Sequence, residues 1–345
     1  MQGRAIIPAD RPAPMPLQGL PAGVELIAGS PAWALVGIET VICVPTYRRP
    51  DMLERTLRSL AAQRGASRFA VIVVENEGSE RAGATRAAAL HAEGLFDGLV
   101  LVEPRQGNCK AYNAAWSGAL AAFPALRFVA GIDDDEEADP GWLAAYLAAA
   151  ACSPAALFGG PVTPRFEDHS RAWLAAHPVF RSHYRASGPI PILYSSANYL
   201  IRREVLDRLG PPFLDERFDF TGGGDSDFFS RAQAAGFRFE WVQEAAQTET
   251  MPARRTQTDW IVARALRNGA LSAMIERSRH PGLRGRLRVL GRSLLLLAAA
   301  PLRGLVLGLR TRSALIGLYH GQVAWGRLSA EWSGAGEQYR KPEAN

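Results

Sequence analysis

The strongest constraint on the fold is a regular alternation of short apolar runs with segments of helical spacing, between about residues 38 and 162. The first run, residues 38–44, is mostly β-branched and is followed by Pro45, which is typical of a buried strand. Pro50 and Asp51 then begin a predicted helix whose leucines share one face. This alternation predicts an α/β fold, in which a mainly parallel sheet has helices on both faces.

The same interpretation extends along the chain. Further strands are predicted at residues 69–74, 99–102, 127–132 and 156–162, and helices at 108–122 and from an N-cap at Asp139 through residue 150. The second half is more mixed, with strands at 194–201 and 237–242 and helices at 203–209 and 256–268. Between them, a glycine-rich loop at 221–225 leads into a helix that ends near Gly236. Residues 1–36 are rich in proline, which predicts an extended arm.

Size and cysteine content limit the class of protein. A chain of 345 residues and 37.3 kDa suits one large or two modest domains with a substantial core. Its cysteines, Cys43, Cys109 and Cys152, are odd in number and far apart, which excludes a disulfide scaffold and indicates a reducing compartment. The N-terminal sequence has no long apolar run behind a basic start, so we expect no secretory signal and a cytoplasmic protein.

The positive charge is concentrated near the C-terminus. Residues 280–330 contain eight arginines and no acidic residue, so the formal net charge of +5 arises from this one segment. A local basic surface argues against a nucleic-acid partner held over the whole fold. It indicates instead a contact made by the C-terminal region alone.

Residues 293–309, within this basic segment, are strongly apolar. Arg303 interrupts them and Arg292 and Arg310 flank them, so fewer than ~18 apolar residues are continuous and a spanning helix is not expected. Leucines interspersed with arginines predict helices that lie in the membrane interface, attracted to anionic lipid. The alternative is a helical hairpin packed on the rest of the protein or in a dimer. We therefore expect a protein that is peripheral on the inner face of the cell membrane, which it contacts through residues 280–330.

Polar side chains follow three of the predicted strands at the points where these strands end. Pro45, Thr46 and Tyr47 follow the first strand, Glu75 follows the second, and an acidic run at 133–139 follows the fourth. The carboxyl ends of parallel strands meet at one edge, where ligands bind. Neither a Walker-type loop nor a glycine fingerprint is present to hold phosphates, but carboxylates can hold a divalent cation that does so. The competing interpretation of the run is a solvated loop in which Asp139 caps the next helix.

Four motifs occur in a particular order: Val-Pro-Thr-Tyr-Arg-Arg-Pro at 44–50, Glu-Asn at 75–76, Asp-Asp-Asp-Glu at 133–136 and Gly-Gly-Gly-Asp-Ser-Asp-Phe-Phe at 222–229. In this order and spacing they resemble family 2 glycosyltransferases of the GT-A nucleotide-sugar fold, in the bacterial branch that builds exopolysaccharide and other surface glycans. The resemblance covers roughly residues 38–270. It implies a nucleotide-diphosphate sugar donor, a divalent metal (Mn²⁺ or Mg²⁺) and inversion at the anomeric carbon.

The resemblance assigns expected roles to residues at the donor site. Pro45, Thr46 and Tyr47 match the segment that lines the base pocket, and Glu75 stands where the family usually has an aspartate that contacts the uridine. The residues from Asp133 to Asp135 match the family's Asp-x-Asp element. This match places Asp133 toward the ribose and the metal, Asp134 with the nucleotide-sugar, and Asp135 on the metal.

Further roles are implied for the second half of the chain. Asp225 matches the general base that accepts the proton of the attacking acceptor hydroxyl. Asp227 is its rival on the same helical turn, although we expect this second aspartate to serve in capping or solvent contact. Gly223 belongs to a loop expected to close over the donor. Arg264 and Arg267 lie near a basic motif that in relatives faces the diphosphate or the acceptor. Outside the motifs, Trp173 and Tyr184 are the aromatic residues that we expect to stack on the acceptor.

The chain departs from the family pattern at two positions. The glutamate usually beside the base is Gly224, and the arginine usual in the segment 107–113 is Tyr112. Lys110, one helical step away, is a candidate for the missing charge, although a surface position would also explain it. These departures concern acceptor handling more than donor binding.

The sequence thus predicts three regions: an N-terminal extension (1–37), a GT-A domain (38–270) and a basic amphipathic helical tail (271–345). The favoured function is an inverting, metal-dependent transfer from a UDP-sugar to a glycan or lipid-linked glycan acceptor. The alternative is a non-catalytic relative that binds nucleotide-sugar or membrane and serves a partner enzyme. A nucleotidyltransferase is disfavoured, because no basic glycine-rich triphosphate loop follows the first strand.

Overall fold

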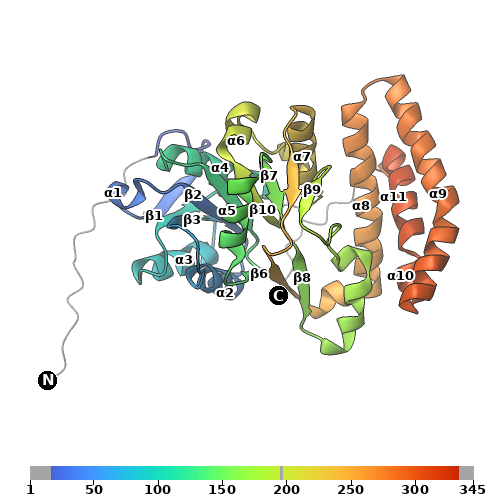
Figure 1. Ribbon diagram of the computed structural model, residues 1–345, viewed down its shortest axis with the longest axis horizontal. Helices are drawn as coiled ribbons and strands as arrows, with labels where there is room; N and C mark the ends of the chain where they lie inside the picture. The colour runs from blue at the N-terminus through green and yellow to red at the C-terminus, as the bar shows by residue number, and fades with distance from the viewer. Residues whose placement is uncertain (1–16, 195–196, 334–345) are drawn as a thin grey trace.

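A computed structural model of the chain describes residues 17–194 and 197–333. Within these residues a nine-stranded sheet has the order β1-β4-β3-β2-β5-β10-β7-β11-β9 (Figure 1). Its strands are β1 (Glu25–Gly29), β2 (Thr40–Thr46), β3 (Phe69–Glu75), β4 (Gly98–Val102), β5 (Phe128–Ile132), β7 (Leu157–Gly159), β9 (Gly188–Ile190), β10 (Asn198–Arg202) and β11 (Phe239–Trp241).

The sheet has a parallel half and a mixed half. β2 pairs in parallel with β3 and β5, and β3 pairs in parallel with β4. β10 is then inserted antiparallel between β5 and β7, and β1 lies antiparallel against β4 at the other edge. The predicted α/β fold with a parallel core is therefore confirmed. β1 and the short helix α1 (Ala32–Leu35) belong to the proline-rich N-terminal region, of which residues 1–16 lie outside the described residues.

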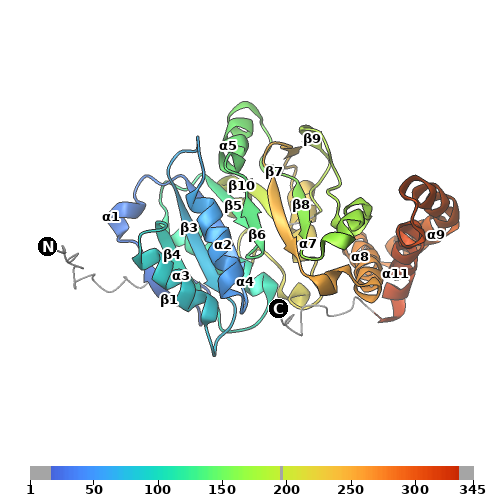
Figure 2. The same cartoon turned by 90° about the horizontal axis from the view of Figure 1, so that it is seen from below.

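Helices cover both faces of the sheet, because successive strand side chains point to opposite sides. One face buries Ile42 and Val44 of β2 under α2 (Pro50–Ala61), α3 (Ala82–Ala92) and α5 (Trp142–Cys152). The other face buries Val41 and Cys43 under α4 (Asn108–Ala122), α6 (Arg203–Leu209) and α7 (Gly224–Ala234). The two helical layers are visible from below (Figure 2).

A small second sheet corrects the prediction for the acidic run. β12 (Gln247–Met251) pairs antiparallel with β6 (Glu136–Ala138) and parallel with β8 (Val162–Phe166). Part of the run is thus a strand. α5 begins at Trp142, with Gly141 as its N-cap. Asp139 contributes its backbone carbonyl, which accepts a hydrogen bond from the Trp142 N–H, while its own N–H donates to the Ala246 carbonyl beyond the end of β6. The predicted strand at 156–162 is accordingly divided into β7 and β8.

Short 3₁₀ turns connect the elements of the second half. They are η1 (His169–Ala176), η2 (Pro178–Phe180), η3 (Glu216–Phe218) and η4 (Ala253–Thr256). η3 precedes the glycine-rich loop, and η4 joins β12 to the C-terminal helices. Both turns therefore lie next to segments that the sequence assigned to the site.

The C-terminal helices form a layer against one end of the domain. α8 (Thr258–Arg279) packs on α11 (Tyr319–Ser333), and α9 (Leu283–Thr311) lies outermost, followed by the short α10 (Ala314–Gly317) (Figures 1 and 2). Gly269 and Gly326 allow close approach of α8 and α11, because a Cβ at either position would collide with backbone of the other helix. The helix predicted at 256–268 extends to Arg279 in the structure, as α8. The domain boundary predicted at residue 270 therefore falls inside this helix.

Candidate active site

The carboxyl ends of β2 and β5 open into a cleft of about 780 Å³ that extends to α8, α9 and α11. Most residues expected at the site line this cleft: Pro45, Thr46, Tyr47, Asp133, Asp134, Asp135, Gly223, Asp225, Arg264 and Arg267. Glu75 and Lys110 are not among its lining residues. The sheet thus brings together groups that are up to about 220 positions apart in sequence, as the strand-end rule requires.

Asp134 joins the end of β5 to the end of β2. Its carboxylate accepts hydrogen bonds from the Thr46 hydroxyl at 2.8 Å and the Tyr47 N–H at 3.3 Å, and Arg49 Nη1 lies 3.2 Å from it. Burial, opposed by the charge of Arg49, raises the pKa of Asp134 to about 6. These bonds fix the segment expected to hold the base.

Asp133 is held by the residue that departs from the family pattern. The buried Tyr112 hydroxyl donates to Asp133 Oδ1 at 2.8 Å, and the Asp133 N–H donates to Glu136 Oε2 at 3.1 Å. Burial, and then the charge of Asp135, raises the pKa of Asp133 to about 7. Tyr112 therefore contacts the carboxylate directly instead of supplying a positive charge.

Asp135 lies between two arginines that the sequence analysis did not select. Its Oδ2 is 2.9 Å from Arg49 Nη1 and 3.3 Å from Arg255 Nη1, and Arg255 is also 2.8 Å from Glu249 Oε1. The Thr250 N–H donates to the Asp135 carbonyl at 2.9 Å, which ties β12 to the acidic run. The signal that could have found these arginines was their position: Arg49 lies within the motif at 44–50, and Arg255 belongs to an arginine pair after a strand.

The carboxyl groups fit a divalent cation by their chemistry. Asp133, Asp134, Asp135, Glu136 and Glu249 outnumber the two arginines beside them, and all five line the cleft. Burial raises the pKa of Glu249 to about 7, and Glu136 Oε1 is a buried oxygen for which the described residues offer no hydrogen-bond partner. Hard oxygen donors with excess negative charge are what Mg²⁺ and Mn²⁺ require. Among the described residues, however, no three potential ligands are already grouped around one point.

Asp225 approaches the cleft from α7, on the side of the C-terminal helices. Gly222 and Gly223 precede it with φ of 73° and 96°, a left-handed region that favours glycine. Packing explains why residue 224 is a glycine, because a Cβ at this position would lie 2.5 Å from Cys109 Sγ. The family's glutamate therefore does not fit at this position unless Cys109 moves.

Asp227 takes a different direction from Asp225. It is buried, it pairs with Arg231 at 2.8 Å and Arg217 at 3.5 Å, and it does not line the cleft. Its expected role in capping or solvent contact is therefore wrong, because these arginines neutralise it inside the fold. Of the two aspartates on this turn, Asp225 faces the cleft.

The remaining candidates are placed as follows. Glu75 Oε2 accepts from the N–H groups of Gly83 at 2.6 Å and Ala84 at 3.3 Å, and burial raises its pKa to about 7. Its carboxylate is thus turned to the start of α3, whereas its neighbour Asn76 lines the cleft. Lys110 pairs with Asp219 and Glu216 at the base of the glycine-rich loop.

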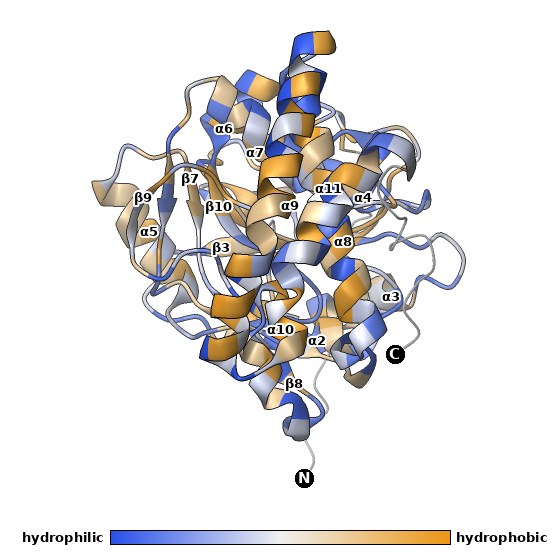
Figure 3. Ribbon diagram, turned by 90° about the vertical axis from the view of Figure 1, so that its right-hand side faces the viewer, coloured by the Kyte–Doolittle hydropathy of each residue, from blue (hydrophilic) through white to orange (hydrophobic). Residues whose placement is uncertain are grey.

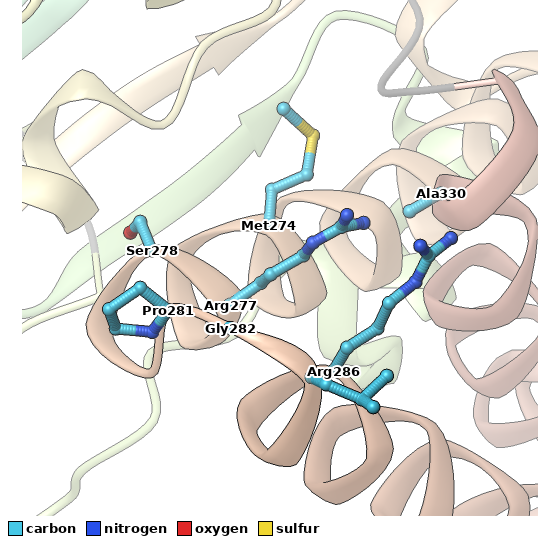
Figure 4. A pocket seen from close by; sticks show the side chains of 8 residues that line it. Met274, Arg277, Ser278, Pro281, Gly282, Arg286 and Ala330 are labelled. Atoms are coloured by element: carbon cyan, nitrogen blue, oxygen red, sulfur yellow. The ribbon is translucent and has the colours of Figure 1, made fainter.

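The aromatic candidates and a second hollow lie farther from the carboxylates. Tyr184 lines the cleft beside Tyr194, whereas Trp173 is exposed outside it. A hollow of about 680 Å³ lies between α8 and α9, where Arg277 and Arg286 extend in the same direction (Figure 4) and both pair with Glu331.

Comparisons with known proteins follow the same motifs. The model of the family described as glycosyl transferase family 2 matches residues 41–210. The succinoglycan biosynthesis protein ExoM of Rhizobium meliloti (strain 1021) is 32% identical over 251 residues, which cover 70% of this chain and 77% of ExoM. The chain belongs to glycosyltransferase family 2. The enzyme class and the recognised family are thereby confirmed.

Solved structures of other glycosyltransferases align with this one. A mannosyltransferase from Pyrobaculum calidifontis, in complex with GDP-Man and Mn²⁺, aligns with a TM-score of 0.54 and 17% identity over 84% of this chain and 87% of that one. TarS of S. aureus aligns with a TM-score of 0.48 and 15% identity, over 85% of this chain and 55% of TarS. Together with the family match, the mannosyltransferase confirms the GT-A architecture predicted from the motifs.

Proposed function

We propose that this glycosyltransferase inverts the anomeric carbon while moving a sugar from a UDP-sugar to a glycan or lipid-linked glycan acceptor, in surface-polysaccharide synthesis. The observation that carries the proposal is the cleft, which is lined both by the carboxylates at the strand ends and by Asp225. The relative named for succinoglycan biosynthesis supports a polysaccharide product. The carboxyl cluster supports a divalent cofactor, as does the Mn²⁺ bound by the similarly folded mannosyltransferase.

At the donor end, Pro45, Thr46 and Tyr47 line the base pocket, and Glu75 supports this pocket from behind through the start of α3. Asp133 and Asp135 would hold the divalent cation, and Asp134 orients the segment that follows β2. When bound, the cation supplies Lewis-acid stabilisation of the departing diphosphate. Gly223 gives the loop before α7 the backbone freedom to adjust over the sugar.

Asp225 is the proposed general base. It would accept the proton of the acceptor hydroxyl while that oxygen attacks the anomeric carbon from the face opposite the diphosphate. It lies in the first turn of α7. An element remote from the strand ends is what this geometry needs.

The acceptor is proposed to enter from the side of the C-terminal helices. There Arg264 and Arg267 of α8, Arg292 of α9 and Tyr319 of α11 continue the cleft wall. Lys110 contributes indirectly, since its pairing with Asp219 positions the loop that carries Asp225. Arginines along this wall suit an acceptor with negatively charged groups.

The outermost helix is the proposed membrane contact. α9 is long and apolar enough to span a membrane by length and composition. Its exposed apolar residues lie within an arc of about 140° at 100° per residue: Leu283, Leu287, Leu294, Leu295, Leu302, Leu305, Val306 and Leu309. Figure 3 shows hydrophobic residues along the α9 ribbon. Since Arg292, Arg303 and Arg310 border the arc and the opposite face packs on α11, we propose that α9 lies in the interface of the inner membrane face.

Thermal stabilisation by a panel of nucleotide-sugars, with and without Mn²⁺, tests the proposal. We expect a UDP-sugar to raise the melting temperature only when the metal is present, and the stabilising donor to release UDP slowly in water. Stabilisation without any UDP release would favour the non-catalytic alternative. No metal-dependent stabilisation by any nucleotide-sugar would contradict the proposed function.

A further inference from the structure

Two arginines, one near the start and one near the end of the catalytic domain's sequence, contact the same carboxylate oxygen. Arg49 stands at the N-cap of α2, directly after β2, whereas Arg255 stands in η4, between β12 and α8. Both reach Asp135 Oδ2, at 2.9 Å and 3.3 Å. Their side chains are only 17% and 14% exposed, and both line the cleft. These guanidinium groups are therefore part of the site and not surface charges.

A divalent cation on Asp135 would compete with these arginines. Asp135 Oδ2 cannot accept a cation at coordination distance while two guanidinium groups remain within 3.3 Å of it, because like charges at such distances repel strongly in a poorly solvated cleft. A displaced Arg255 keeps Glu249 as a partner and a displaced Arg49 keeps Asp134, but each loses the charge of Asp135, which a further anion can replace. The diphosphate of a donor is such an anion, and the planar fork of an arginine matches phosphate oxygens.

Resting on the proposed function of this cleft, we propose that Arg255, assisted by Arg49, exchanges partners: it pairs with Asp135 in the free enzyme and with the donor diphosphate once a metal occupies Asp135. Arg255 is the more displaceable of the two. It stands in a short 3₁₀ turn, whereas Arg49 begins a helix and also contacts Asp134. Glu249, 2.8 Å from Arg255, offers a place for this side chain during the exchange.

The exchange makes metal and nucleotide bind synergistically. Metal alone must break the Arg255–Asp135 pair without a phosphate to replace the lost partner, and nucleotide alone meets the carboxylates at the strand ends with no cation between them. Each ligand thus removes a cost for the other, which is a positive coupling between their affinities. We therefore expect the loss of Arg255 to change two affinities in opposite directions. Metal alone should bind more tightly, and nucleotide in the presence of metal should bind more weakly.

The test measures Mn²⁺ and UDP binding to the full chain by calorimetry, with wild type, Arg255→Gln, Arg255→Lys and Arg165→Gln. Arg165 of β8 is the matched control, since it pairs with Glu137 of β6 and does not line the cleft. We expect Arg255→Gln to tighten Mn²⁺ binding without UDP by several-fold and to weaken UDP binding with Mn²⁺ by about tenfold, within the usual range of coupling between ligands. Arg255→Lys, which keeps the charge but not the fork, should fall between, and Arg165→Gln should match wild type.

The outcomes separate the inference from the proposed function. If wild type binds UDP with Mn²⁺ but Arg255→Gln weakens both ligands or changes neither, the exchange is overturned and the donor site stands. If wild type binds no nucleoside diphosphate with Mn²⁺, both the exchange and the proposed function are overturned. Melting temperatures within a few degrees of wild type verify that each variant is folded. If Arg255→Gln does not fold, the same two signs are tested with Arg255→Lys.

Discussion

The cleft and the C-terminal helical layer both bury charged side chains, but they balance them differently. In the cleft, five carboxyl groups surround Arg49 and Arg255, and burial raises the pKa of Asp133 and Glu249 to about 7. In the helical layer, Arg327 is only 3% exposed and is matched by Glu276 at 2.6 Å and by two serine hydroxyls. Unbalanced buried charge is costly unless a ligand completes it, whereas balanced charge is part of the fold. The comparison therefore marks the carboxylates at the strand ends as the place for a charged ligand and the Arg327–Glu276 pair as part of the fold.

The largest effect that would sharpen this comparison is on stability. Arg327→Met removes a buried guanidinium group and leaves Glu276, whose side chain is 12% exposed, without this partner, so we expect the free energy of unfolding to fall by about 3–5 kcal/mol. UDP binding by the folded fraction should be unchanged, as measured beside urea denaturation. Arg292→Met, which removes a 62%-exposed partner of the same glutamate, serves as the control and should cost less than about 1 kcal/mol. Equal losses in the two variants would contradict a matched buried pair.

In the cleft, replacing a charged side chain should affect catalysis and not stability. Asp225→Asn removes the proposed proton acceptor, so we expect transfer to slow by roughly 10²-fold or more, with little change in donor affinity. Asp227→Asn is the control on the same turn. Because Asp227 pairs with Arg231 and Arg217, its loss should lower the melting temperature more than the turnover of the folded enzyme. Reversed effects on turnover, with donor binding intact, would show that Asp225 is not the base.

The outer face of the helical layer offers a third contrast, because it exposes leucines while the layer's interior holds paired charge. Leu295 and Leu302 are 73% and 70% exposed, and we expect their double replacement by glutamate to lower binding to anionic vesicles by tenfold or more, since each buried leucine contributes about 1.5–3 kcal/mol. Flotation measures the change. Trp33→Glu, at an equally exposed position on α1, should float like wild type. Unchanged flotation of the double variant would reject the interfacial role of α9.

A smaller effect is expected behind the carboxylates. Tyr112→Phe removes the hydroxyl that donates to Asp133, and partners of metal ligands typically change metal affinity by about tenfold or more. We expect weaker Mn²⁺ binding in the presence of UDP with an unchanged melting temperature. Tyr199→Phe is the control, because its hydroxyl accepts from Trp116 and does not contact Asp133. Similar Mn²⁺ affinities in both variants would indicate that Tyr112 is only a core residue.

The strand ends were predictable from sequence because an apolar strand fixes where its last residue lies. The segments after β2 and β5 therefore meet in the cleft as the pattern predicts. Side-chain direction was not predictable in the same way. Glu75 follows its strand as expected, yet it turns to the N–H groups that begin α3, a choice made by tertiary packing.

The parts that sequence reasoning missed depend on long-range pairing. Arg255 reaches Asp135 only because β12 pairs with β6, which contains the end of the acidic run. Glu136–Ala138 of the acidic run form β6 for the same reason, so the competing interpretation of the run as a solvated loop is wrong for these residues. The need for a glycine at position 224 comes from its contact with Cys109, a residue more than a hundred positions away. The sequence shows where these residues stand in the chain but not which of them meet in the fold.

The most direct test of the cleft as a metal-assisted donor site is calorimetry of UDP binding to Asp135→Asn, with and without Mn²⁺. Loss of an indirect partner already costs a metal site about 10–100-fold, so loss of a proposed ligand should weaken Mn²⁺-dependent UDP binding by roughly 10²-fold or more. The melting temperature should stay near that of wild type, because the amide is nearly isosteric with the carboxylate and still fits between β5 and β12. Unchanged binding of UDP and Mn²⁺ in a folded Asp135→Asn variant would contradict the assignment of this carboxylate to the metal.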